Sequence, residues 1–265
     1  MNLYSRQQHQ AECLTYYKQV GTRLPCLDAN FQAGHINREH FLSEAISSVD
    51  LRLYSPLAEC VILVTISSRA LTHKQVSDVE IMYGSAAPRD FCARHEWLSS
   101  MLMRRLDSFR KNYPSLSLAS DPMIMFAYMV AHTTVMYLYC IMEPFSKDEN
   151  YDCLPWDFSE RGLSAAQEVA CLAKKQQPVG YFRMHTFMPL PIYLSVVKLR
   201  VYLEQRRTAG YRLEEIGQIE TSLQASLDAL QRLQPVNQLA TYYLGLLDGN
   251  KDLVGLTINE GWVSG

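Results

Sequence analysis

Apolar residues recur at intervals of three and four along most of the chain, which is the spacing that lays them on one face of a helix. The clearest examples cover residues 57–71, 91–109 and 213–233. Before the first of these segments, Ser55-Pro56 supplies a capping hydroxyl and a proline at the first helical position. The sequence has no alternating run of β-branched residues bounded by the Asn-Gly or Asp-Gly turns that are typical of hairpins. The pattern predicts an all-α fold.

One segment is apolar on every face. Residues 123–142 carry no formal charge over twenty positions, which is the length that crosses a bilayer. Such a helix either spans a membrane or lies at the centre of a sizeable soluble bundle. His132, Thr133 and Thr134 at its centre, and the lack of Lys or Arg within four residues of either end, favour the bundle. We therefore predict a single helical domain around a long central helix at about 121–143, and no association with a membrane.

The C-terminal part contains the cleanest amphipathic stretch. Its apolar residues step by three or four: Leu213, Ile216, Ile219, Leu223, Leu227, Leu230 and Leu233. A stripe of this kind packs against the chain's own core or against a partner helix, and the first is commoner for a single short stripe. We expect amphipathic helices at about 212–248, within one all-helical domain that covers residues 1–265.

Composition and charge narrow the function. The net charge is −2 and the isoelectric point is about 6.4, so the basic excess that neutralises nucleic-acid phosphates is absent. The longest basic clusters are pairs such as Arg104-Arg105 and Arg206-Arg207, which predict solvated helix surface. The N-terminal residues are too polar for a signal peptide. We expect an intracellular, cytoplasmic protein that does not bind a specific DNA sequence directly.

Sequence motifs give little support to metal, redox or hydrolytic chemistry. No two of the seven cysteines are closer than thirteen residues, so a short metal-ligand pair is missing. His35 and His40 are five residues apart without a carboxylate pattern around them. The nucleophile elbow GxSxG, the zinc motif HExxH and the glycine-rich phosphate motifs do not occur. We therefore expect neither a metal nor a cofactor.

Polar side chains interrupt the apolar segment 123–142. Tyr128 and His132 are four residues apart and share a helix face, and Thr133 and Tyr137 form a second such pair. One interpretation makes them ordinary core residues. The other makes them a hydrogen-bonding wall in an apolar cavity, with His132, Tyr137 and Tyr128 as catalytic donors. The side chains that would contact a substrate in that cavity are Trp97, Met125, Met129, Thr133, Met136, Trp156, Tyr181 and His185.

Four phrases of the sequence, taken in order, are specific to a known family. They are LYSPLAECVILVTISSRAL at 53–71, DF and RHEWL within 90–98, DPM at 121–123 and AHTTVMYL at 131–138. In order and spacing they resemble the later half of the middle homology region of fungal binuclear zinc-cluster transcription factors. The resemblance extends over about 25–205.

The resemblance implies an all-helical regulatory body that follows a DNA-binding zinc cluster and responds, in some members, to small molecules. The cluster itself needs six closely spaced cysteines among basic residues, and no such group precedes Leu53 in this sequence. The family's DNA-binding activity therefore does not carry over to these residues.

Two functions remain open. The first is a stand-alone, cofactor-independent cyclase or pericyclase of the Diels-Alderase type in fungal terpenoid or polyketide biosynthesis. Such a reaction needs only a shaped apolar pocket and one polarising donor. The alternative is a ligand-sensing transcriptional regulatory domain or co-regulator, which would work in the nucleus. We favour the cyclase here, because a pocket survives loss of the zinc cluster. Either protein would bind an apolar small molecule, and a homodimer is compatible with both.

Overall fold

The computed structural model describes residues 21–35, 39–48, 54–82, 88–113, 121–142, 158–175, 184–210 and 212–249. Within these ranges the chain is helical, and its extended backbone pairs only at an isolated antiparallel bridge between Arg23 and Phe41. The predicted all-α fold is confirmed.

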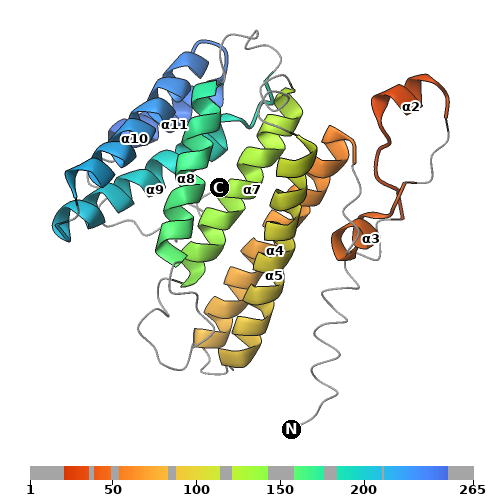
Figure 1. The fold of residues 1–265 in the computed structure, drawn as a ribbon, viewed down its shortest axis with the longest axis horizontal. Coiled ribbons are helices and arrows are strands. Elements are labelled where there is room, and N and C mark those ends of the chain that lie inside the picture. Colours follow the sequence, from red (N-terminus) through yellow and green to blue (C-terminus); the bar gives the residue numbers. More distant parts are fainter. Residues whose placement is uncertain are drawn as a thin grey trace.

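The long helices form layers around one central element (Figure 1). In chain order they are α2 (Asp28–Gln32), α3 (Leu42–Ser47), α4 (Pro56–Met82), α5 (Pro88–Asn112), α7 (Pro122–Met142), α8 (Phe158–Lys175), α9 (Pro189–Thr208), α10 (Leu213–Leu233) and α11 (Gln238–Gly249). Helix α7 packs most extensively against α8 on one side and α4 on the other. Helix α5 lies beside α4, and α9, α10 and α11 lie beyond α8.

Helix α7 is the predicted central helix. Its start is fixed by Asp121, whose Oδ1 accepts hydrogen bonds from the N–H groups of Met123 at 2.9 Å and Ile124 at 3.2 Å. Pro122 occupies the first helical position, where its missing N–H costs nothing. The helix is long and apolar enough to cross a membrane, yet 89% of its most apolar 18-residue window is buried inside the protein. It is the core helix of the bundle.

Helix α4 is longer than the sequence pattern predicts. Helix α4 begins as predicted, with the Ala58 N–H donating to Ser55 Oγ at 3.2 Å, but it continues to Met82. The apolar spacing stops near Leu71 because the later turns carry polar residues, including the ion pair of Lys74 and Asp78. Turns made of polar residues continue the helix, but they lack the apolar period by which a helix is predicted from the sequence.

The apolar stripe of α10 packs against the chain's own α8 and α9. Ile219, Leu230 and Leu233 are buried, whereas Leu213 at the first turn is 87% exposed. The stripe is therefore used inside the molecule, as expected for a short amphipathic helix.

The sequence predicts that the basic pairs are solvated. This prediction is wrong for one arginine in each of two pairs. Arg104 and Arg207 are exposed, but Arg105 and Arg206 are buried. Neighbouring residues on a helix point about 100° apart, so one can face the core while the other faces water. Arg206 forms an ion pair with Glu160 of α8.

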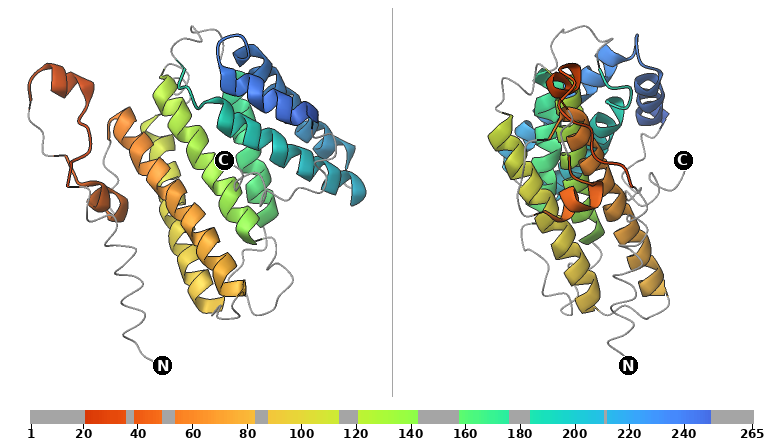
Figure 2. Two further views of the ribbon diagram at one scale, coloured as in Figure 1. Left: turned by 180° about the vertical axis from the view of Figure 1, so that it is seen from behind. Right: turned by 90° about the vertical axis from the view of Figure 1, so that its right-hand side faces the viewer.

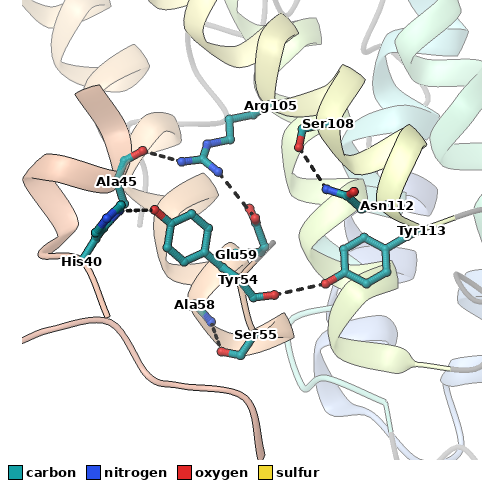
Figure 3. A network of polar contacts seen from close by, with 10 residues as sticks. All are labelled: His40, Ala45, Tyr54, Ser55, Ala58, Glu59, Arg105, Ser108, Asn112 and Tyr113. Atoms are coloured by element: carbon teal, nitrogen blue, oxygen red, sulfur yellow. Dashed lines mark hydrogen bonds and ion pairs between the residues drawn. The ribbon is translucent and has the colours of Figure 1, made fainter. Parts of the chain in front are cut away.

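The buried Arg105 connects α3 to the bundle (Figure 3). Its guanidinium donates to the backbone carbonyl of Ala45 in α3 and lies 3.5 Å from Glu59 Oε1 in α4. It also lies 5.2 Å from the centroid of the Tyr54 ring, whose hydroxyl is 2.9 Å from Nδ1 of His40. One cation thus joins α3, α4 and α5.

The Glu59 carboxylate depends on that cation. Burial raises the pKa of Glu59, and the positive charge of Arg105 opposes the rise. Its Oε2 is buried without a hydrogen-bond partner among the described residues. Arg105 therefore supplies most of the favourable interaction that offsets the desolvation of this carboxylate.

We predict that Arg105→Met lowers the free energy of unfolding by roughly 3–5 kcal/mol, because it leaves a buried carboxylate unpaired. Urea unfolding followed by circular dichroism measures the change. The exposed neighbour provides the control, and Arg104→Met should change stability by less than about 0.5 kcal/mol. Adding Glu59→Gln to Arg105→Met should recover part of the loss. Equal effects at the two arginines would contradict the assignment.

Candidate functional site

The polar residues of α7 lie on two sides of the helix. Tyr128 and His132 share one face and pack edge to face, with ring centroids 4.6 Å apart. The Tyr128 ring stacks on Phe109 of α5 at 5.6 Å, and its hydroxyl accepts a hydrogen bond of 3.0 Å from Nε of Arg110. This predicted pair therefore exists, and it faces α5.

His132 is the least satisfied of these groups. Its Nε2 is buried and has no hydrogen-bond partner in the described part of the chain. Burial lowers the pKa of His132 to about 3, and the positive charge of Arg110 adds to this effect. The imidazole is therefore neutral at physiological pH, and in that state it offers one N–H donor and one acceptor.

Thr133 and Tyr137 do not extend that face. The Thr133 hydroxyl donates to the Met129 carbonyl at 2.9 Å, which uses its proton inside the helix. Tyr137 is nine residues from Tyr128, half a turn away around the helix, and its pKa is raised to about 12 by burial and by Asp78 of α4. The structure thus places Tyr137 toward α4 and the pair of Tyr128 and His132 toward α5.

The other candidate residues are dispersed. Met125, Met129 and Met136 are buried along α7. The His185 ring, which precedes α9, stacks on Phe126 with centroids 3.9 Å apart. Trp97 is 47% exposed on α5, under the guanidinium of Arg69 at 5.4 Å. Trp156 and Tyr181 lie outside the described residues.

A cluster of two buried histidines, away from His132, was not predicted from the sequence. His73 of α4 and His95 of α5 are buried with ring centroids 5.6 Å apart, and Phe91 packs against both. All four ring nitrogens lack hydrogen-bond partners within the described ranges. His95 follows Phe91 at helical spacing on an apolar face, but its approach to His73 depends on the packing of two helices.

Burial lowers the pKa of both members of this cluster. The pKa of His73 falls to about 3, with contributions from His95 and Arg94, and that of His95 falls to about 4. Two neutral imidazoles are a partial ligand set for a transition metal. Among the described residues, however, no group of three or more His, Cys, Asp or Glu side chains could hold a metal ion.

We predict that stability falls as the pH drops below about 6.5. Folding holds His73, His95 and His132 neutral, whereas the unfolded chain binds protons at the ordinary pKa of 6.5, so the unfolded state gains protons first. The stabilisation is fully present above pH 6.5 and is lost on acidification toward pH 3–4, by about 1.4 kcal/mol per pH unit for each imidazole.

Urea unfolding at pH 7, 6 and 5 measures this dependence. His73→Leu, which removes one titrating group from the core, should make the fall in stability shallower. His35→Gln, at an exposed position, should leave the slope unchanged. A free energy of unfolding that stays constant from pH 7 to pH 5 would contradict the assignment.

Three fungal proteins are similar to most of this chain. The pigment biosynthesis transcriptional activator pigB of Monascus ruber is 34% identical over 88% of this chain and 41% of its own length. The citrinin biosynthesis transcriptional activator ctnR of Monascus purpureus is 34% identical over 86% of this chain and 38% of its own. The azaphilone cluster-specific transcription factor azaR of Aspergillus niger is 35% identical over 64% of this chain and 36% of its own.

These proteins are all named as fungal regulators of transcription. Most of the chain is therefore homologous to a region of fungal pathway-specific transcription factors, and the resemblance expected from the sequence is confirmed. The chain spans about two-fifths of the length of the first two relatives. No protein-family model and no solved structure matches the chain.

Proposed function

We propose that this chain is a regulatory region for transcription of a fungal secondary-metabolite gene cluster, and that it works in the nucleus. The observation that carries the proposal is the extended similarity to named activators of pigment and citrinin biosynthesis. This is the alternative that the sequence left open. The relatives support it and give no support to the cyclase that we favoured from the sequence.

The packing of α7 is consistent with a regulatory body. The Tyr128 hydroxyl is engaged by Arg110, and the hydroxyls of Thr133 and Thr134 donate to carbonyls one turn earlier in α7. A catalytic donor has to point at the position where charge develops in a substrate. Most of these groups instead stabilise the core.

We propose further that the region senses an apolar small molecule beside α7. The supporting feature is His132, whose buried Nε2 is a polar group without a partner among the described residues. A ligand that donates to or accepts from this nitrogen would gain a hydrogen bond that folding leaves unmade. Because α7 packs against both α4 and α8, a shift of α7 would reach both halves of the bundle.

Deleting the gene in its source fungus tests the regulatory function. We expect transcripts of the neighbouring biosynthetic genes to fall together, since an activator acts on the whole cluster. Quantitative sequencing of RNA measures this, and reintroduction of the intact gene is the control. Unchanged transcripts together with accumulation of one late intermediate would contradict regulation and favour an enzyme.

Cofactor-free cyclisation of an apolar, carbonyl-bearing metabolite is the second candidate function. It is favoured by the same unpartnered nitrogen of His132, which could polarise a carbonyl in a dry site. For this function, His132→Ala should slow turnover by roughly ten- to a thousand-fold, the range for one lost donor. His35→Ala, at an exposed histidine, is the matched control.

Purified chain incubated with the late intermediate of the neighbouring pathway measures this activity by the rate of product formation. Conversion at the background rate would remove the cyclase and leave the regulatory function standing.

A further inference from the structure

The two buried histidines between α4 and α5 have the chemistry of a ligand site. The two helices run antiparallel along one side of the bundle (Figure 2), and His73 and His95 meet between them at 3% and 5% exposure. Their four ring nitrogens are four of the seven buried side-chain nitrogen and oxygen atoms that lack a partner in the described part of the chain. Buried polar atoms in proteins are normally paired with a protein group, a water or an ion.

The distance between the two rings decides what can lie between them. A water that bridges two facing ring nitrogens, with about 2.9 Å on each side, sets the ring centres about 8 Å apart. One ion bound at about 2 Å by each nitrogen sets the ring centres about 6 Å apart. The ring centroids of His73 and His95 are 5.6 Å apart. This spacing fits a shared ion better than a shared water.

The number of ligands selects the ion. Zn²⁺ takes four ligands, and Ca²⁺ and Mg²⁺ take oxygen ligands. Among the described residues no group of three or more His, Cys, Asp or Glu side chains could hold a metal ion, so the two imidazoles have no third partner of these types. Copper(I) is a soft ion that binds imidazole and is stable with two nitrogen ligands in a line. Linear coordination sets no condition on the angle between the ring planes, which is 53° for this pair.

Both imidazoles are available to a cation. Burial lowers the pKa of His73 to about 3 and that of His95 to about 4, so no proton has to be displaced at physiological pH. Phe91 is 2% exposed and packs against both rings, which keeps water away from them. A dry site favours a monovalent over a divalent ion, because the cost of desolvation rises with the square of the charge.

The charged side chains beside the pair are compensated. Lys74 lies 2.5 Å from Asp78, and this ion pair lies within α4. Arg94 of α5 lies 2.5 Å from Glu80 of α4. The positive field that remains from Arg94 contributes to the lowered pKa of His73. Such a field opposes a divalent ion twice as strongly as a monovalent one.

From these observations we infer that His73 and His95 form a copper(I) site that joins α4 to α5. One nitrogen of each ring binds the ion, and Phe91 shields it from water. The site is separate from His132 of α7, and the inference is independent of the proposed function. Because the ion binds only where both helices are packed together, copper(I) stabilises the packing of α4 on α5.

Titration of the full 265-residue chain with copper(I) under argon, in competition with the chromophoric chelator bicinchoninate, tests the inference. Thiolates also bind copper(I), so the accessible cysteines are first alkylated with iodoacetamide. We expect one equivalent of copper(I) to bind. His73→Leu and His95→Leu should each weaken binding at least about a hundredfold, because loss of a supporting group alone costs roughly ten- to a hundredfold. His35→Leu, at an exposed position, is the matched control and should bind as the wild type does.

X-ray absorption at the copper edge identifies the ligands in the alkylated wild type. We expect two nitrogen ligands at about 2 Å and no sulfur ligand. Circular dichroism verifies that the variants fold, as expected when leucine replaces an unpaired polar ring in a core. A folded wild type that binds no copper(I), sulfur ligands in the absorption spectrum, or binding that both leucine variants leave unchanged would each overturn the site.

Discussion

The fold depends on the almost complete burial of α7. A helix with no polar face cannot lie at a surface without leaving apolar side chains in water, so other helices must cover it on all sides. Helices α4 and α8 cover most of it, α5 and α9 add further contacts, and α3, α10 and α11 attach to those helices. The layered arrangement in Figure 1 follows from this one requirement. The same burial explains why the hydroxyls of Thr133 and Thr134 bond within the helix, where no water is available to them.

Much of this fold could be predicted from the sequence, because the signals were local. The cap at Asp121 and the uncharged run after it define α7 without knowledge of its neighbours. The length of α4 was underestimated because its last turns, around Lys74, have no apolar period. The buried Arg105 was missed for a different reason: its burial is decided by a carbonyl in α3 and a carboxylate in α4, and neither is encoded near it.

The candidate site was less predictable than the fold. Helical spacing correctly placed Tyr128 beside His132, because residues four apart share a face. Spacing along one helix could not show that Tyr137 faces a different neighbour, or that His73 and His95 meet across two helices. For function, residue chemistry favoured an enzyme with a regulator as the alternative, and similarity to named activators supports the regulator. A buried histidine alone does not distinguish a sensor from a catalyst.

The ion pair of Arg105 and Glu59 also limits how this region can evolve. A mutation at either residue alone leaves an unpaired charge in the core, so a single step away from the pair passes through a poorly folded intermediate. Replacement by an apolar pair requires two simultaneous changes, although the final state could be as stable as the present one. Arg105 also donates to the backbone carbonyl of Ala45, and a substitution at Ala45 would leave that carbonyl in place. Lineages that descend from this chain should therefore keep both charges or lose both together.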